Sequence, residues 1–347
     1  MLEPGVTIAP LMNSGECYKL VKRIYGLEVS RVSELNGYDD KNFKVAVGSK
    51  GDENVQLYVL KVLNSLDSKK LGFIQAQNAL LLHLGERGII CPQPQQTQTG
   101  GYYAIEQLRS GAHVVRLMKF IDGSILHQVE GSWDLYYKAG EYIATIDNLL
   151  QDFYHVAYET HSSMWMLDSV PQLRPFLDKV PDLNKQEKFA EIISAFEREV
   201  LKIGHNLPRG IIHGDFNEQN VVVSALNGTP EIRGVLDFGD SQKGCYVYEL
   251  AIAMTYMMIV SKKVAMGGAV LQGYLKQRSM TDEELGLLRI CILARLSQSL
   301  IMGAYSAHLH PENAAYLLTT SVSGWAMFED IYKYTNEELL ALWLKQA

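Results

Sequence analysis

Two short segments of this chain concentrate side chains that could do chemistry. The first is His213-Gly-Asp-Phe-Asn-Glu-Gln-Asn220, and the second is Asp237-Phe-Gly239. Buried polar groups are costly to leave without partners, so a function is the simplest reason for this density of polar residues. Asp215 could accept or orient the proton of an attacking hydroxyl group. Asn220 and Asp237 could offer oxygen ligands to Mg²⁺.

Short strands are predicted beside these polar segments. β-Branched residues run through 221–223 and 232–236, and Asn227-Gly228 between them is typical of a hairpin turn. The polar residues sit at the ends of these runs. Taken alone, His213 is more typical of a structural histidine that orients its loop than of a catalytic group.

The two halves of the chain differ in their predicted elements. Up to residue 121, alternating apolar residues and turn chemistry predict strands, with one amphipathic helix; after Asp122-Gly123, long helical patterns prevail. We expect strands at 43–47, 55–63, 102–107 and 113–121 and helices at 71–84, 135–154, 185–203, 248–260 and 281–307. The prediction is an α+β chain with an N-terminal unit, 1–121, and a C-terminal unit, 122–347.

One lysine in the N-terminal unit has an unusual place. Lys61 shares the alternating strand face of Leu57 and Val59, where an ammonium group needs a partner. A phosphate is one such partner. The alternative is a lysine at the sheet edge whose ammonium reaches solvent.

The polar segments resemble the catalytic and metal-binding segments of the protein-kinase-like superfamily, in which H-x-D-x-x-x-x-N is followed by Asp-Phe-Gly. The resemblance implies a two-lobed fold, with an antiparallel-sheet N-lobe containing one helix and a mainly helical C-lobe. It implies nucleotide-binding roles for Lys61, for Gly37 in the phosphate loop, and for Met118 and Phe120 in a hinge at 118–123. It also implies that Asp215 orients the substrate hydroxyl, while Asn220 and Asp237 hold Mg²⁺.

The chain departs from protein kinases in several places. A helix follows Asp-Phe-Gly almost at once, so there is no room for an activation segment, and Gly214 stands where protein kinases usually have arginine. These features are similar to the aminoglycoside phosphotransferase and choline kinase group, which implies a small alcohol as substrate. The phosphate loop has a single glycine, and Gln75, with Gln77 nearby, replaces the acidic partner of the strand lysine. A pseudokinase that binds nucleotide without turnover is therefore one alternative.

Within that group, residues 210–325 are most similar to the hydroxylysine kinases. The similar stretches in this range are Ile211-Ile-His-Gly-Asp215, Leu236-Asp-Phe-Gly-Asp240, Tyr248-Glu-Leu-Ala-Ile252 and Pro311-Glu-Asn313. Tyr38-Asp-Asp-Lys-Asn-Phe43 and Met118-Lys-Phe-Ile-Asp-Gly123 extend the similarity into the N-terminal unit. The resemblance implies 5-hydroxy-L-lysine as substrate, GTP (or ATP) as phosphoryl donor and a role in lysine degradation. Kinases for choline, ethanolamine, homoserine or an aminoglycoside are the alternatives.

Hydroxylysine carries two ammonium groups and one carboxylate, so acidic side chains and one cation should line its pocket. The candidates are Glu218, Asp240 and Glu249 for the ammonium groups and Arg295, inside an apolar helix, for the carboxylate. Helix capping, solvated surface and a structural ion pair are the competing explanations.

Composition excludes several other classes of function. The net charge is −7 and no basic patch stands out, so we expect no nucleic-acid partner. The apolar run at 250–260 is too short to cross a membrane, and no leader pattern is visible, which predicts a cytoplasmic protein. Cys17, Cys91, Cys245 and Cys291 are far apart, as expected for reduced thiols rather than zinc ligands or disulfides.

Overall fold

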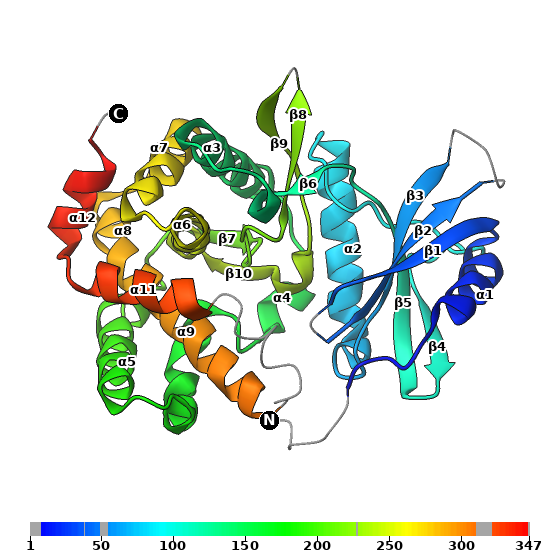
Figure 1. Cartoon of the computed structure of the whole chain (residues 1–347), viewed down its shortest axis with the longest axis horizontal. Coiled ribbons are helices and arrows are strands. Elements are labelled where there is room, and N and C mark those ends of the chain that lie inside the picture. The colour runs from blue at the N-terminus through cyan, green and yellow to red at the C-terminus, as the bar shows by residue number, and fades with distance from the viewer. Residues whose placement is uncertain (1–7, 38, 49–54, 227, 310–320, 346–347) are drawn as a thin grey trace. The chain divides into compact units, whose positions relative to one another are not determined.

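The computed structural model describes residues 8–37, 39–48, 55–226, 228–309 and 321–345 (Figure 1). The chain forms two compact units. The first, here called the sheet unit, ends at Asp122 and also includes His155–Ala157. The second, the helical unit, comprises Gly123–Tyr154 and the chain from Tyr158 onward. Tyr38, Asn227 and Pro311-Glu-Asn313, which the sequence analysis used, lie outside the described residues.

The sheet unit is built on a five-stranded antiparallel sheet with the strand order β1-β2-β3-β5-β4. The strands are β1 Val29–Leu35, β2 Lys41–Val47, β3 Gln56–Val62, β4 Ala104–Leu108 and β5 Gly111–Lys119. Alternation along β2 and β3 buries Phe43, Val45 and Leu60 on one face. The hairpin and the two later strands are confirmed; β1 was not predicted.

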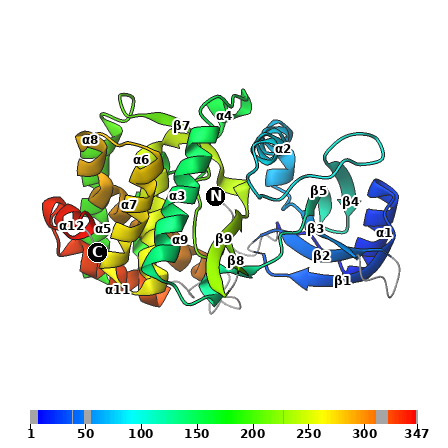
Figure 2. The same ribbon diagram turned by 90° about the horizontal axis from the view of Figure 1, so that it is seen from above.

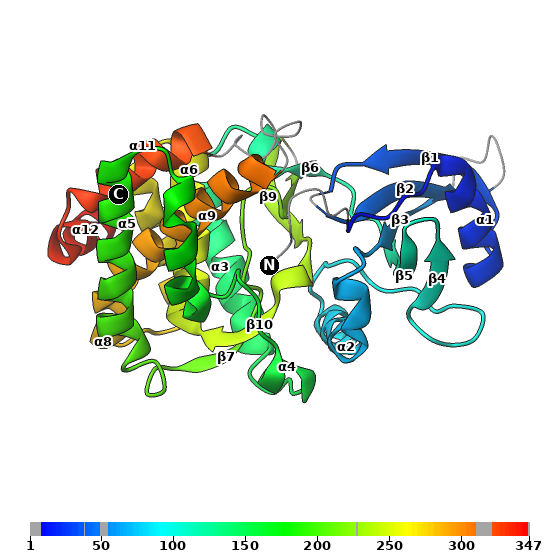
Figure 3. The same ribbon diagram turned by 90° about the horizontal axis from the view of Figure 1, so that it is seen from below.

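Two helices lie on opposite sides of this sheet (Figures 1 and 3). Helix α2 (Leu71–Glu86) is the predicted one. Helix α1 (Ser14–Tyr25) was not predicted, and it packs on the face that carries Phe43. Its sequence does contain start and stop signals, because Asn13 and Glu16 form a capping box and Gly26 ends the helix in the left-handed region.

The helical unit is organised around α6 (Tyr246–Ser261), which is almost completely buried and lies among its neighbouring helices (Figures 1 and 2). Those neighbours are α3 Trp133–Leu149, α7 Gly267–Gln277, α9 Leu288–Leu309 and α11 Ser321–Tyr332. Helix α9 has the length and apolar composition of a membrane-spanning helix, but most of it is buried against α6 and α5 (Leu183–Phe196). It therefore serves as a core helix of this unit.

Some element boundaries differ from those predicted. The segment 281–307 is divided at Leu287 into α8 (Asp282–Gly286) and α9, and the helix predicted at 185–203 ends as α5 before a π-helical turn. Helices α7, α11 and α12 (Asn336–Trp343) were not predicted.

Three strand pairs hold the polar segments in place. Strand β7 (Arg209–Ile212) pairs with β10 (Gln242–Cys245), and the two lie side by side in Figure 3. Strand β8 (Val221–Leu226) pairs with β9 (Thr229–Val235), and the short β6 (Ser124–Ile125) joins the β8 edge. Strands β6 and β10 were not predicted, so the strand-rich region extends past residue 237.

The cysteines are as expected. All four are buried and free. Burial raises the pKa of the Cys245 thiol to about 11, so it is an unreactive thiol at neutral pH. Within the described part of the chain, no group of three or more His, Cys, Asp or Glu side chains could hold a metal ion.

Candidate active site

Strand register brings Asn220 and Asp237 to the same end of the β8–β9 hairpin. Val221 pairs with Val235, and the N–H of Leu236 donates to the carbonyl oxygen of Asn220 at 2.7 Å. Asn220 directly precedes Val221 and Asp237 comes two residues after Val235, so both lie at this end of the hairpin, although the whole hairpin separates them in the sequence. This is the placement that the predicted metal-binding role requires.

The carboxylate of Asp215 is held by three side chains of the helical unit. Its Oδ2 accepts hydrogen bonds from Nδ2 of Asn217 at 2.9 Å and from Nδ2 of Asn220 at 3.0 Å. Its Oδ1 accepts one from Nη2 of Arg295 at 2.7 Å. Burial raises the pKa of Asp215 to about 6, whereas the Arg295 guanidinium and the two amides act in the opposite direction. Asp215 is thus mainly ionised at neutral pH and close to the range where a general base works.

Arg295 is anchored on more than one side. Its side chain is 2% exposed, its Nη1 donates to Oε1 of Gln298 at 3.0 Å, and its guanidinium lies near the rings of Trp165 and Tyr256. Its predicted role was to receive the substrate carboxylate. The structure instead gives this cation to Asp215, which is the structural ion pair that the sequence analysis weighed against it.

His213 has a structural place. It is fully buried, its Nδ1 accepts the N–H of Asp215 at 3.2 Å, and its Nε2 faces the carbonyl oxygen of Leu236 at 2.8 Å. These two contacts suit a neutral ring that is protonated on Nε2. Burial lowers the pKa of His213 to about 4, so the ring stays neutral at neutral pH. It ties the loop to the end of β9.

Gly214 and Glu249 hold the loop that carries Asp215 against helix α6. Gly214 has φ +79°, and a Cβ there would lie 2.5 Å from the carbonyl oxygen of Asp240, so no other residue fits without a shift. Its N–H donates to Oε2 of Glu249 at 3.0 Å. Glu249 is fully buried, and burial raises its pKa to about 7. The carboxyl group is enclosed by the protein and bonded to the loop backbone through Oε2, and its predicted contact with substrate stays a prediction.

The pair Asn220 and Asp237 fits a hard cation that completes its coordination from elsewhere. Both amide hydrogens used by Asn220 point to Asp215, to its Oδ2 and to its carbonyl oxygen, which leaves the side-chain oxygen of Asn220 as the ligand atom. Asp237 is exposed and has φ 51°, an uncommon backbone conformation for a residue other than glycine. One carboxylate and one amide oxygen suit Mg²⁺, which in proteins takes its remaining ligands from phosphates and water.

The two other acidic residues that were predicted to bind a cationic substrate are Glu218 and Asp240. Glu218 is 5% exposed, burial raises its pKa, and its buried Oε2 accepts no hydrogen bond from the described residues. Asp240 follows Asp237 in the same short 3-10 turn and is half-buried. An enclosed carboxylate with an unused oxygen, three positions after Asp215, points to a cationic partner.

In the sheet unit, Lys61 pairs with an acidic side chain outside helix α2. Its Nζ lies 3.3 Å from Oδ2 of Asp40, between β1 and β2. Gln75, the position where the sequence analysis looked for the partner, donates instead to the Tyr103 hydroxyl at 3.3 Å. Gln77 is buried and accepts a hydrogen bond from Arg116 at 2.9 Å.

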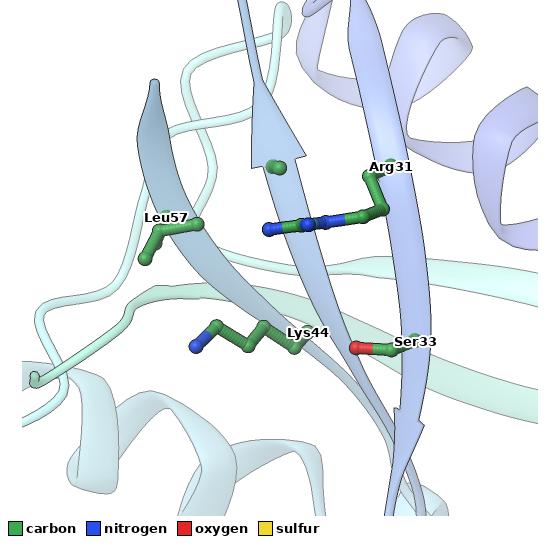
Figure 4. A pocket seen from close by; sticks show the side chains of 5 residues that line it. Arg31, Ser33, Lys44 and Leu57 are labelled. Carbon is green, nitrogen blue, oxygen red and sulfur yellow. The ribbon is translucent and has the colours of Figure 1, made fainter. Parts of the chain in front are cut away.

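The sheet face that carries Lys61 also has a hollow. Figure 4 shows Arg31, Ser33, Lys44 and Leu57 around it, on neighbouring strands β1, β2 and β3; Ala46 completes the lining. Nζ of Lys44 lies 3.8 Å from the centre of the Phe120 ring. The face therefore combines apolar and cationic side chains, as a nucleotide site does.

The predicted hinge residues differ in what they offer. Met118 pairs with Val59 on β3 and is almost fully buried. The N–H of Phe120 donates to the carbonyl oxygen of Leu57 at 3.0 Å, so it is not available to a base. Gly37 lies in the turn before β2, where a Cβ would be 2.4 Å from the carbonyl oxygen of Asp40.

The sequence analysis missed two residues that shape these sites. Asn217 holds Asp215 and also accepts the N–H groups of Gln219 and Asn220, which closes the loop into a compact turn. The Asp-x-Asn spacing is a local signal of such a turn. Asp40 had no comparable local signal, because its partner, Lys61, lies on β3 and not near it in the sequence.

The amino-acid sequence is similar to those of known phosphotransferases. A model of the phosphotransferase enzyme family matches residues 32–284. The chain is 30% identical to a hydroxylysine kinase of Xenopus laevis, over 97% of this chain and 94% of that protein. It is 25% identical to a homoserine kinase of Methylobacillus glycogenes, over 89% of this chain and 90% of that protein.

Solved structures share the fold. A microcompartment-associated aminopropanol kinase superposes with a TM-score of 0.74 at 15% identity and covers 95% of this chain and 100% of its own. The GDP complex of an aminoglycoside 2'-phosphotransferase superposes with a TM-score of 0.62 at 14% identity, covering 92% of this chain and 99% of its own. The predicted protein-kinase-like α+β fold is confirmed.

Proposed function

Because the chain belongs to the phosphotransferase enzyme family, we propose that it transfers the terminal phosphoryl group of a nucleoside triphosphate to the hydroxyl group of 5-hydroxy-L-lysine. The observation that carries phosphoryl transfer is the Asp215 carboxylate, held by Asn217, Asn220 and Arg295 next to the Asn220 and Asp237 pair. Asp215 orients the hydroxyl and accepts its proton as the new bond from oxygen to phosphorus forms, while the bond from that phosphorus to the bridging oxygen breaks and nucleoside diphosphate leaves. Mg²⁺, when bound by Asn220 and Asp237, neutralises phosphate charge.

Glu218 supports the choice of hydroxylysine over homoserine. In hydroxylysine the side-chain ammonium is on the carbon next to the one that bears the hydroxyl group, whereas in homoserine the nearest ammonium is further along the chain. A buried carboxylate three residues after Asp215 suits an ammonium close to the reacting hydroxyl. The curated relatives named hydroxylysine kinase cover almost the whole chain and support the same substrate.

The phosphoryl donor is proposed to be GTP, with ATP as the alternative. The hollow on the sheet unit is lined by Arg31, Ser33 and Lys44, whose side chains can donate hydrogen bonds. Guanine presents acceptors at N7 and O6, whereas adenine presents an amino group in place of O6. Cationic donors therefore favour guanine. A role in lysine degradation would follow from this substrate.

The direct test is to measure phosphoryl transfer from GTP and from ATP to hydroxylysine, homoserine, ethanolamine, choline and an aminoglycoside. We expect the highest kcat/KM with hydroxylysine and GTP, and loss of most turnover in Asp215→Ala. A higher kcat/KM with another acceptor would replace the substrate. No transfer to any acceptor would instead support a pseudokinase.

A second variant tests the acceptor site without removing the proposed base. Glu218→Gln should raise KM for hydroxylysine by about tenfold or more while changing KM for GTP little, because it removes one charge from the proposed ammonium site. The matched control is Glu187→Gln, an exposed surface change in the same unit. If Glu218→Gln changed KM for hydroxylysine and KM for GTP equally, Glu218 would have no specific role in acceptor binding.

A further inference from the structure

The carboxylate that pairs with the ammonium group of Lys61 does not come from helix α2, where the sequence analysis looked for it. Nζ of Lys61 lies 3.3 Å from Oδ2 of Asp40, and the two side chains are only 20% and 17% exposed. Neither residue is on a helix, since Lys61 is on β3 and Asp40 lies between β1 and β2. A charge pair that is largely shielded from solvent interacts more strongly than one on an open surface.

Polar side chains of helix α2 bind a different cationic residue, Arg116. Arg116 on β5 pairs with Lys61 across the sheet, and it is 3% exposed. Its Nη1 donates to Oε1 of Gln77 at 2.9 Å and its Nη2 to Oδ1 of Asn78 at 2.6 Å. The two buried polar residues of α2 on this face are thus neutral amides that bind a neighbouring arginine, and the carboxylate beside Lys61 comes from the turn.

Asp40 is fixed before any ligand arrives. Its Oδ1 accepts hydrogen bonds from the backbone N–H of Asn64 at 2.8 Å and from Nδ2 of Asn64 at 3.1 Å. Asn64 is 4% exposed, and its own Oδ1 accepts the N–H groups of Leu66 and Asp67. One oxygen of Asp40 is therefore held by a buried anchor, and the other is left for Lys61.

Gly37 lies very close to the backbone of Asp40. A Cβ on Gly37 would lie 2.4 Å from the carbonyl oxygen of Asp40 and 2.7 Å from Nδ2 of Asn42, so the chain can pass this close only as glycine. Nδ2 of Asn42 also donates to the carbonyl oxygen of Asn36 at 3.3 Å. The single glycine of this segment therefore helps to place a carboxylate.

We propose that Asp40 is the positioning residue that holds Lys61 for the nucleotide phosphates, in place of an acidic side chain on helix α2. The inference rests on the proposed phosphate-binding role of Lys61. A lysine side chain has many rotamers, and a fixed carboxylate selects one of them before the nucleotide binds. The carboxylate directs the ammonium group, so the gain appears in nucleotide binding and turnover.

The test uses the full chain and reads the affinity for Mg²⁺-GTP and Mg²⁺-ATP by calorimetry. Asp40→Asn keeps an oxygen that can accept from Asn64 but removes the charge beside Lys61. We expect roughly tenfold weaker nucleotide binding in Asp40→Asn and partial recovery in Asp40→Glu. The matched control is Glu34→Gln, which removes one exposed carboxylate from the same hairpin, where Glu34 pairs with Lys41.

A double-mutant cycle separates positioning from a general effect of charge or stability. If Asp40 acts through Lys61, Asp40→Asn should cause no further loss of affinity in a Lys61→Met background. Losses that add independently would overturn the inference, and so would unchanged or tighter binding in Asp40→Asn. Free energies of unfolding of the variants, from urea titration, identify any loss that comes from a smaller folded fraction.

The outcomes also distinguish this inference from the proposed function. If hydroxylysine is not phosphorylated but the chain binds nucleotide and the Asp40 effect depends on Lys61, then the proposed substrate fails and the inference stands. If turnover is as proposed but Asp40→Asn behaves like Glu34→Gln, the inference alone is overturned. A wild-type chain that binds neither nucleotide overturns the inference together with the nucleotide-dependent function.

Discussion

Nη2 of Arg295 lies 2.7 Å from Oδ1 of Asp215, which joins the core helix α9 to the loop that follows β7. The arginine side chain is 2% exposed and the aspartate side chain 22%, so the pair is buried on the arginine side and open on the other. The guanidinium opposes the effect of burial on the pKa of Asp215. Arg295 is therefore best understood as the group that orients this carboxylate and keeps it ionised.

Replacing Arg295 should change how activity depends on pH. Arg295→Met removes the cation that lowers the pKa of Asp215, so the pKa should rise and the acidic limb of kcat/KM should move to higher pH, with a fall in kcat of about ten- to a hundredfold. Arg295→Lys keeps the positive charge, so its kcat and the position of its acidic limb should lie between those of the wild type and of Arg295→Met. The control is Arg289→Met on the same helix, where Arg289 donates to the carbonyl oxygen of Tyr332. An unshifted limb in Arg295→Met would contradict this role.

The wild-type protein should lose activity below about pH 6. The pKa of Asp215 is raised to about 6, and a base must be deprotonated to act, so kcat/KM should fall about tenfold for each unit of pH below that value. His213 cannot cause this limb, since its pKa is lowered to about 4. The measurement is a profile of kcat/KM from pH 5 to pH 9. Activity that stays level down to pH 5 would argue against Asp215 as the base.

Removal of Asp237 should act on metal and nucleotide more than on the acceptor. Asp237→Ala deletes the carboxylate at the end of the β8–β9 hairpin, so Mg²⁺-dependent nucleotide binding should weaken by tenfold or more. Calorimetric titration of nucleotide with Mg²⁺, and again with EDTA, measures this difference. Asp215→Ala is the matched comparison, and it should leave nucleotide binding largely intact. Identical affinities in Asp237→Ala and the wild type would be incompatible with the metal-binding role.

The loop chemistry could be predicted because its parts are local. Asn220 and Asp237 flank one hairpin, so turn signals and alternating strands were enough to place them together. Arg295 was recognised only as a charge in an apolar helix, because its contact with Asp215 depends on how α9 packs. Asp40 could not be predicted as the partner of Lys61, because their contact depends on how the turn before β2 lies against β3.

The secondary structure likewise could be predicted where it follows local patterns and not where it depends on tertiary contacts. Helix α2 and the central strands had clear periodicity, whereas β6 and β10 are short strands whose residues are held by pairing and burial more than by local pattern. Helix α1 has a capping box at Asn13 and a terminal Gly26, but the segment between them is polar on average, so its apolar face was easy to overlook.

The buried carboxyl group of Glu249 should make stability fall as pH rises. Its pKa is raised from 4.5 to about 7, so the folded protein keeps this proton between those values while the unfolded chain loses it. The free energy of unfolding should then decrease as pH rises from about 4.5 to 7, and a shift of this size corresponds to about 3 kcal/mol. Glu249→Gln has no proton to lose, so the part of this slope that Glu249 contributes should disappear.

Urea titrations at pH 5, 6, 7 and 8 measure the effect of Glu249→Gln. Glu187→Gln, on the exposed surface of the same unit, is the control and should keep the wild-type slope. Asp147 is also fully buried with a raised pKa, so part of the decrease should remain in Glu249→Gln. A slope in Glu249→Gln equal to that of Glu187→Gln would show that Glu249 is already ionised in the folded protein.

Gly214 should be sensitive to the smallest possible side chain. At φ +79° an alanine is strained by about 1–2 kcal/mol, and its Cβ would also meet the carbonyl oxygen of Asp240 at 2.5 Å. Relief of that contact must move Asp215, the next residue, so Gly214→Ala should lose most of its turnover as well as stability. Gly88→Ala is the control, because Gly88 has φ +85° with no atom within 4 Å of the added Cβ. Unfolding titrations and kcat distinguish the two: if Gly214→Ala costs no more than Gly88→Ala and keeps its kcat, the close packing of this loop is not required for activity.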